Sequence, residues 1–336
     1  MLPEKVQKSL EKQHYRIVGK NKHSAVQICQ WTKKAIRGED CCYKEKFYGI
    51  KSHRCCQMTP SLWCPNQCLH CWRAIEFTTG EKIPGQIDSA KEIVDGCIEA
   101  QRNLLRGFKI LPETRYKTRS KANMKKWEEA QEPMQFAISL SGEPTIYPNL
   151  GELIKELRKR KKTSFLVTNG LYPEVLKKLE KKKQLPTQVY VSVNAPNERL
   201  YDKFHRSTKK DAWKKLNETL EFLPRIRKKT RTVFRINLVK DLNMSNELIP
   251  EYAQLIKKSR PQFIEIKGFM HVGFAKERLR YEQMPWHREV KDFAKKLSVE
   301  LKRLKENYKI LDEFEYSRVL VMGKDKKELK IKENEI

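Results

Sequence analysis

The sequence has no apolar run long enough to cross a bilayer, and residues 1–8 lack the apolar core of a signal peptide. Both absences argue against a membrane-spanning or secreted protein. Nine cysteines in such a chain are typical of a reducing compartment, where thiols bind metals rather than form disulfides. We therefore expect a cytoplasmic protein with no membrane partner.

Acidic residues are few compared with basic ones. The chain of 336 residues has 42 Asp and Glu against 71 Lys and Arg, which gives a formal net charge of +29. A heat-adapted surface would be rich in charges of both signs in rough balance. The imbalance instead predicts a polyanionic partner such as a nucleic acid.

The cysteines of residues 63–73 lack the second half that a zinc site usually needs. Cys64, Cys68 and Cys71 follow a C-x3-C-x2-C spacing, and no second knuckle follows farther along the chain. His53 or His70 could still complete a zinc site, which is the less favoured alternative. Three thiols can instead hold an iron–sulfur cluster and leave one iron open for a substrate or cofactor.

Residues 1–56 are rich in cysteine and basic residues and show no clear strand. Cys29, Cys42 and Cys55 are spaced thirteen residues apart, which suits three separate turns or helix ends that converge on a second cluster. Buried free thiols are the alternative. Within the two doublets, Cys41 could replace Cys42 and Cys56 could replace Cys55.

The rest of the chain alternates between short apolar strands and amphipathic helices, which predicts parallel β/α units. The expected strands are 57–63, 135–141, 163–168, 188–194, 231–239 and 262–269, with an extra one at 314–322. The expected helices are 89–106, 149–161, 173–182, 211–223, 247–258 and 286–305. The charged tail, residues 324–336, is expected to be frayed.

Polar residues follow several of the predicted strands, at the edge where parallel β/α folds bind ligands. Gly142 and Glu143 follow the second strand, Thr168-Asn169-Gly170 end the third, Ser192 and Asn194 end the fourth, and Asn237 lies late in the fifth. Each alone is an ordinary turn signal. An insertion at 107–132 mixes basic residues with Tyr116 and Trp127, which indicates either a solvated face or an RNA contact.

The C-x3-C-x2-C spacing resembles the signature of the radical S-adenosylmethionine (SAM) superfamily. The resemblance implies an α/β fold, a partial (β/α)6 barrel over residues 57–323, with an N-terminal extension at 1–56 and an extra C-terminal strand. It also implies that Cys64, Cys68 and Cys71 hold a 4Fe–4S cluster whose open iron chelates SAM. By the same resemblance, the expected SAM contacts are Gly142, Glu143, Ser192 and Asn194.

Longer motifs narrow the resemblance to the archaeal form of the tRNA 4-demethylwyosine synthase family, from about residue 10 to about residue 322. These motifs occupy residues 42–50, 52–55, 71–73, 192–197 and 265–273. The family joins two carbons of pyruvate to N1-methylguanosine beside the anticodon of phenylalanine tRNA. It binds a second 4Fe–4S cluster through three upstream cysteines, which map to Cys29, Cys42 and Cys55.

The resemblance leaves the handling of pyruvate open. Pyruvate could bind the open iron of the second cluster or form a Schiff base with a lysine, for which Lys44 is the candidate by its position in the motif. No flavodoxin-like region precedes the cysteines, so we expect a separate electron donor, and we expect a monomer. Two other classes are considered: a radical SAM enzyme acting on a different RNA, protein or small molecule, and a zinc-containing RNA-binding protein.

Overall fold

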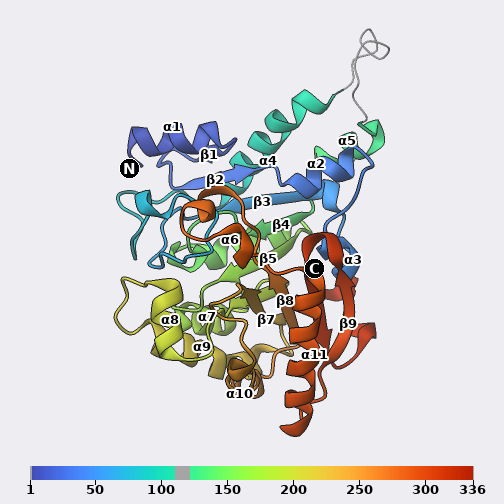
Figure 1. Ribbon diagram of the computed structural model, residues 1–336. Helices are drawn as coiled ribbons and strands as arrows, with labels where there is room; N and C mark the ends of the chain where they lie inside the picture. The colour runs from blue at the N-terminus through green and yellow to red at the C-terminus, as the bar shows by residue number, and fades with distance from the viewer. Residues whose placement is uncertain (1, 110–121, 336) are drawn as a thin grey trace. The chain divides into compact units, whose positions relative to one another are not determined.

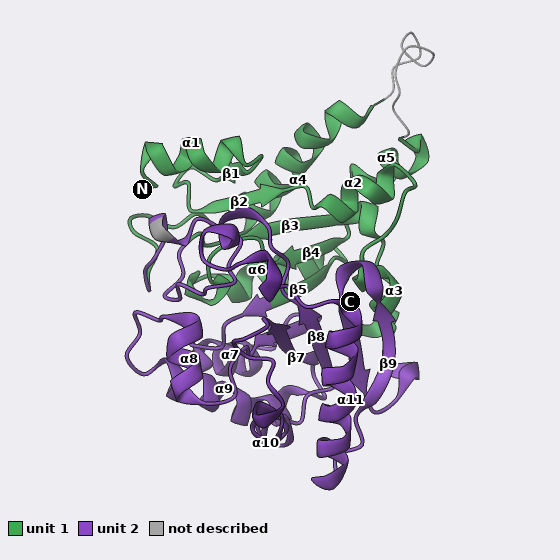
Figure 2. Cartoon of the chain, in the orientation of Figure 1, with its two compact units in different colours: residues 1–62, 82–166, 330–336 green, residues 63–81, 167–329 purple. Residues whose placement is uncertain are grey.

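The computed structural model describes residues 2–109 and 122–335. The chain forms two compact units, shown in two colours in Figure 2. One unit consists of residues 1–62, 82–166 and 330–336, and the other of residues 63–81 and 167–329. None of the helices in the described residues combines the length and apolarity needed to span a membrane.

The first unit is built on strands that lie side by side in chain order (Figure 1). The pairs β1–β2 and β2–β3 are antiparallel, whereas β3–β4 and β4–β5 are parallel. β4 and β5 are almost wholly buried, as apolar runs of this length predict. The strands are β1 (Arg16–Val18), β2 (Ser24–Gln27), β3 (Cys55–Thr59), β4 (Gln135–Ile138) and β5 (Thr163–Thr168).

The helices of this unit pack on its sheet and on one another. α4 begins with a capping box, in which the Ser89 hydroxyl accepts from the Glu92 amide and the Glu92 carboxylate accepts from the Ser89 amide. α4 packs against β1, β2, β3 and α6. The helices are α1 (Glu4–Lys12), α2 (Gln30–Ile36), α3 (Tyr43–Tyr48), α4 (Ala90–Leu105), α5 (Met124–Ala130) and α6 (Leu150–Lys159).

The second unit has a parallel group of strands, β6 (Gln188–Ser192), β7 (Arg231–Leu238) and β8 (Phe263–Gly268). β10 (Val319–Gly323) pairs antiparallel with β8, and β9 (Lys309–Phe314) pairs antiparallel with β10. Its helices are α7 (Pro173–Lys181), α8 (Glu198–His205), α9 (Ala212–Ile226), α10 (Ile249–Ser259) and α11 (His287–Arg303).

The six strands and six helices predicted as β/α units are confirmed as β3 to β8 and as α4, α6, α7, α9, α10 and α11. Their hydrophobic periods are long enough to identify each element. The helices α1, α2, α3, α5 and α8 were not predicted, because at six to nine residues each they carry little periodic signal.

Three expectations are wrong. Residues 1–56 contain β1 and β2, whose three and four residues are too short to show alternation. The extra C-terminal strand is a hairpin of two, β9 and β10. The tail is docked rather than frayed, since the Ile331 amide donates to the Tyr48 carbonyl at 3.0 Å and Lys330 Nζ donates to the Lys46 carbonyl at 2.5 Å.

The two compact units cut across the expected domains 1–56, 57–323 and 324–336. The expected domains assign the second cluster to the N-terminal extension and the SAM-binding cluster to the barrel. This assignment stays a prediction.

Candidate active site

The loop with Cys64, Cys68 and Cys71 belongs to the second unit, and its two arms are tied together. Cys64 forms a parallel bridge with Thr79. The Cys64 amide donates to the Thr78 carbonyl and the Gly80 amide donates to the Cys64 carbonyl, both at 3.0 Å. The thiols therefore project from a closed loop rather than from a free strand end.

The end of α8 holds the middle of this loop. The Gln67 amide donates to the His205 carbonyl at 2.8 Å, and the Leu69 amide donates to the Phe204 carbonyl at 3.0 Å. These two hydrogen bonds fix the backbone of the residues on either side of Cys68. The position of Cys68 is thus set by a helix that begins more than a hundred residues later.

Arg278 and Gly273 hold the end of the loop. The Arg278 guanidinium donates to the carbonyls of Cys71 and Arg73, and its Nε approaches the carbonyl of Leu69 at 3.4 Å. Gly273 has a φ of +55°, and a Cβ atom there would lie 2.3 Å from the Trp72 carbonyl oxygen. Only glycine allows this approach. Arg278 and Gly273 therefore both contact backbone carbonyls at the end of the loop.

The three thiols suit an iron–sulfur cluster in chemistry and spacing. Burial and the neighbouring Cys64 and Cys71 raise the pKa of the Cys68 thiol. Metal binding displaces the thiol proton and removes this penalty. Among residues 2–109 and 122–335, no three His, Cys, Asp or Glu side chains converge closely enough for a single metal ion.

Gly142 and Glu143 follow β4 in the first unit. Gly142 has a φ of +66°, and a Cβ there would lie 2.1 Å from the Ser61 carbonyl oxygen. Glu143 is 2% exposed, and its Oε1 accepts from the amide of Thr145 at 3.1 Å and from its hydroxyl at 2.6 Å. The glycine therefore lets this turn contact residues 61–62, next to the cysteine loop in the sequence, and the carboxylate is held in a fixed direction.

Ser192 and Asn194 lie at the carboxyl end of β6 in the second unit. Ser192 is half-buried. The Asn194 side-chain oxygen accepts from the Asn237 amide at 2.9 Å, and its carbonyl accepts from Asn243 Nδ2 at 2.7 Å and from the Tyr252 hydroxyl at 3.0 Å. The Asn194 side-chain oxygen keeps a second lone pair and its amide nitrogen can donate, so either atom could contact a ligand. The assignment of all four residues to SAM stays a prediction.

Cys29, Cys42 and Cys55 meet in the first unit, as the prediction of converging helix ends requires. Cys29 and Cys42 immediately precede α2 and α3, and Cys55 begins β3. Desolvation, followed by the charge of Cys29, raises the pKa of Cys42 above its usual range and that of Cys55 to about 12. The three thiols are therefore near neighbours, and their role as ligands stays a prediction.

Lys44 lies beside this second triad. Its ammonium is the group whose charge opposes the rise in pKa of both Cys42 and Cys55. The side chain is 8% exposed, and Nζ lies 5.2 Å from the centre of the Phe165 ring. A primary amine is thus held among cysteine thiols and an aromatic ring, away from bulk water.

The other cysteines have different surroundings. Cys56 is fully buried and shares a hydrogen bond with Cys97. It differs from Cys55 because consecutive strand residues point to opposite faces of the sheet. Desolvation raises the pKa of Cys41, and the negative charges of Glu45 and Asp40 raise it further. These environments support Cys42 and Cys55 as the members of the two doublets that belong to the triad.

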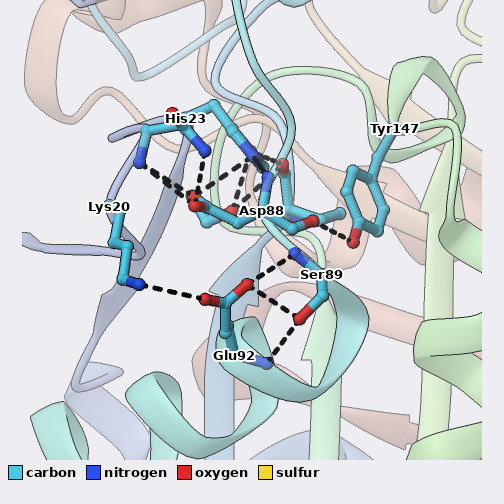
Figure 3. A network of polar contacts seen from close by, with 9 residues as sticks. Lys20, His23, Asp88, Ser89, Glu92 and Tyr147 are labelled. Atoms are coloured by element: carbon cyan, nitrogen blue, oxygen red, sulfur yellow. Dashed lines mark hydrogen bonds and ion pairs between the residues drawn. The ribbon is translucent and has the colours of Figure 1, made fainter.

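Figure 3 shows a polar network around His23, Asp88 and Tyr147. It also binds Pro60 and Leu62, directly before the cysteine loop. His23 Nε2 accepts from the Asp88 amide at 2.9 Å, so Nδ1 carries the hydrogen and donates to the Pro60 carbonyl at 2.8 Å. The His23 carbonyl accepts from the Leu62 amide at 3.1 Å. Tyr147 donates to the Asp88 carbonyl at 2.8 Å and completes the network.

Sequence reasoning missed His205, Arg278 and the pair of His23 and Asp88. No spacing rule connects them to the cysteines, because each contacts the loop or its approach from far along the chain. His53 Nε2 lies 2.7 Å from Glu129 Oε2, and His271 Nε2 lies 2.9 Å from the Leu279 carbonyl oxygen.

Part of the basic insertion lies outside the described residues: Arg115, Tyr116, Lys117, Arg119 and Lys121. Within the described part, Lys109 Nζ lies 5.7 Å from the centre of the Trp127 ring. Trp127 Nε1 donates to the Leu105 carbonyl at 2.8 Å. Trp127 is therefore a structural anchor at the base of the insertion.

We expect acid to destabilise the cluster-free protein through two buried histidines. Burial, with smaller effects from His205 and nearby arginines, lowers the pKa of His70 to about 3, and burial lowers the pKa of His205 to about 3. The unfolded chain binds these protons near pH 6.5, so stability is full above that pH and falls as pH drops toward 3. Each histidine costs about 1.4 kcal/mol per pH unit in that window.

The measurement is urea unfolding at pH 7.5 and 5.5. The variant His205→Asn should lose less stability than the wild type, by about 1 kcal/mol. Equal losses in both proteins would contradict the assignment.

Two family models match the chain. The radical SAM superfamily model covers residues 58–253, and the model described as wyosine base formation covers residues 258–324.

Curated relatives match nearly the whole of this chain. The S-adenosyl-L-methionine-dependent tRNA 4-demethylwyosine synthase of Pyrococcus abyssi is 44% identical over 96% of this chain and 90% of its own. The protein of the same name from Methanocaldococcus jannaschii is 36% identical over 98% and 99%. The mouse relative is 37% identical over 97% of this chain but only 42% of its own length.

Two solved structures are similar over nearly the whole chain. A structure of TYW1 with a lysine–pyruvate adduct bound has a TM-score of 0.82, 34% identity, and coverage of 99% of both chains. A crystal structure of archaeal TYW1 has a TM-score of 0.74, 32% identity, and coverage of 96% and 97%. These likenesses confirm the expected fold class, an α/β partial (β/α)6 barrel.

Proposed function

This chain belongs to the family of radical SAM tRNA 4-demethylwyosine synthases, and we propose that it joins two carbons of pyruvate to N1-methylguanosine beside the anticodon of phenylalanine tRNA. The protein is an enzyme that acts on tRNA and uses SAM and a 4Fe–4S cluster. The observation that carries the detailed proposal is the buried Lys44 amine beside the second cysteine triad.

Cys64, Cys68 and Cys71 would hold the SAM-binding cluster. When bound, the cluster and SAM supply a 5′-deoxyadenosyl radical that takes a hydrogen atom from the N-methyl group of the base. The tied loop, the end of α8 and Arg278 fix where the thiols stand. Glu143 would accept bonds from the SAM amino group, and Ser192 and Asn194 would reach its ribose.

Lys44 would hold pyruvate as a Schiff base, with loss of water. A related solved structure contains a lysine–pyruvate adduct, which favours this route over binding of pyruvate to iron. The methylene radical of the base would add to the imine carbon and leave the unpaired electron on the imine nitrogen. Cleavage of the bond to the carboxylate would restore the imine and expel the carboxyl group as a CO2 radical anion, and attack of the guanine amino group on the imine would close the new ring and release Lys44. Burial of Lys44 protects the Schiff base from hydrolysis until tRNA arrives.

A second 4Fe–4S cluster on Cys29, Cys42 and Cys55 would lie next to Lys44. Its thiols are near neighbours, and the lysine charge acts on two of them. In this place the cluster would polarise the bound pyruvate or hold its carboxylate. The electrons would come from a separate low-potential protein, and we propose that the enzyme acts as a monomer in the cytoplasm, where its nine free cysteines stay reduced.

Mass spectrometry of tRNA tests the proposal. Phenylalanine tRNA bearing N1-methylguanosine is incubated anaerobically with enzyme, SAM, pyruvate and dithionite. We expect 4-demethylwyosine in the nucleoside digest, and a labelled product when pyruvate carries ¹³C at C2 and C3. A modified base that lacks the ¹³C label, or unchanged tRNA beside rapid SAM cleavage, would favour a different substrate.

The net charge of +29 predicts strongly salt-dependent tRNA binding. If four to six phosphates are neutralised, affinity should fall roughly a hundredfold or more between 50 and 200 mM salt. Filter binding or fluorescence anisotropy measures this slope. The variant Lys125→Glu, on α5 within the insertion, should reduce the slope, whereas Lys155→Glu on α6 is the matched control. Binding that ignores salt would contradict a basic tRNA-binding surface.

A further inference from the structure

His205 is the last residue of α8, and its ring reaches the middle cysteine of the loop. Nδ1 lies 3.0 Å from Cys68 Sγ, and the side chain is 2% exposed. The His205 carbonyl accepts from the Gln67 amide at 2.8 Å, so ring and backbone both contact the loop. The two groups meet across 137 positions of sequence.

Neighbouring rings keep the imidazole in place. The Tyr201 ring centre lies 4.5 Å from that of His205, and the Phe204 ring centre lies 5.1 Å away. Because the ring is packed and the backbone is bonded to the loop, the imidazole has little freedom to turn away from the sulfur.

The direction of this hydrogen bond follows from the chemistry of the site. A cluster-bound Cys68 is a thiolate, which can only accept, so Nδ1 must carry the hydrogen. His205 Nε2 is buried without a hydrogen-bond partner. With the hydrogen on Nδ1, Nε2 is an unprotonated acceptor rather than a buried N–H donor without a partner. The same tautomer therefore donates to the Cys68 thiolate and leaves no unpaired N–H group.

We propose that His205 is a positioning residue that raises the reduction potential of the SAM-binding cluster by donating Nδ1–H to Cys68 Sγ. Reduction adds one electron, whose charge spreads onto the cysteine sulfurs. An N–H dipole aimed at a sulfur stabilises this added charge, and burial strengthens the effect. The inference rests on the proposed role of Cys68 as a ligand.

Two side-chain or backbone donors near Cys64 are more distant from their sulfur than His205 is from Cys68. Cys64 Sγ has the Asn66 amide at 3.4 Å and Asn169 Nδ2 at 3.8 Å. Since the effect of a donor falls with distance, His205 should contribute more than either. A higher potential would ease electron transfer from the external donor and weaken the driving force for SAM cleavage, so His205 would set the balance between the two steps.

Potentiometric EPR tests the proposal on the full chain loaded with iron and sulfide, with dithionite as reductant. The signal that changes on addition of SAM identifies the cluster to follow. In His205→Leu, the equilibrium constant for one-electron reduction should fall by about threefold to tenfold, where tenfold corresponds to 59 mV. His205→Asn places an amide N–H near the Nδ1 position and should restore the wild-type value.

Thr208→Val is the matched control. The Thr208 hydroxyl donates to the Pro65 carbonyl at 3.2 Å, so its loss loosens the loop without removing a donor to sulfur. Its potential should match the wild type. A wild-type potential in His205→Leu, or an equal shift in Thr208→Val, would overturn the proposal.

Two further variants keep the outcomes distinct. If His205→Leu fails to hold a cluster, His205→Gln replaces it, because its amide reaches the Nε2 position and should produce the same negative shift. Cys68→Ser tests the premise: unchanged iron content and an unchanged SAM-responsive signal would show that Cys68 is no ligand, which overturns the ligand assignment and this inference together.

Discussion

Replacement of Cys68 by alanine should abolish formation of 4-demethylwyosine, to below about a thousandth of the wild-type rate, because the protein itself cannot supply the radical chemistry. The two bonds from α8 hold the loop through backbone atoms, so the variant keeps its fold and loses only a sulfur ligand. Iron analysis should show the loss of about half of the bound iron, since the second triad is unaffected.

The matched control is Cys41→Ala. Cys41 is a half-buried thiol next to Cys42 but outside the proposed ligand set. Its replacement should leave iron content and product formation near the wild-type level. If Cys68→Ala retained full activity, or if both variants lost the same iron, the assignment of the SAM-binding cluster would be refuted.

Lys44→Met should stop product formation while SAM cleavage continues. Methionine keeps an unbranched apolar side chain and removes the amine that lies over the Phe165 ring. Without a Schiff base, turnover should fall by at least about a thousandfold. Release of 5′-deoxyadenosine without modified tRNA, measured by chromatography and mass spectrometry, would show this uncoupling.

Borohydride trapping distinguishes the two ways of holding pyruvate. Wild-type enzyme with ¹⁴C-pyruvate and borohydride should retain label on the peptide that contains Lys44, and Lys44→Met should not. Lys46→Ala is the control, because Lys46 lies on the same helix, α3, but is exposed. Normal turnover in Lys44→Met, with no trappable adduct in the wild type, would instead favour binding of pyruvate to the open iron of the second cluster.

The second triad illustrates how far spacing alone can lead. Thirteen-residue intervals indicated separate turns, and Cys29 and Cys42 do lie directly before helices. The choice within each doublet needed the fold, because Cys55 and Cys56 differ only in the face of β3 that they occupy. Cys56 points to Cys97 in the core, whereas Cys55 points to Cys29 and Lys44.

The sequence by itself determined the cysteine loop, the family, the six β/α units and the basic charge, because each depends on spacing, periodicity or composition along the chain. Only the tertiary structure decided how the loop is held and which residues touch its sulfurs and carbonyls. His205 and Arg278 lie 137 and 207 positions from Cys68 and Cys71. Contacts over such separations depend on which strand ends and helix ends the fold brings together, and no local pattern records them.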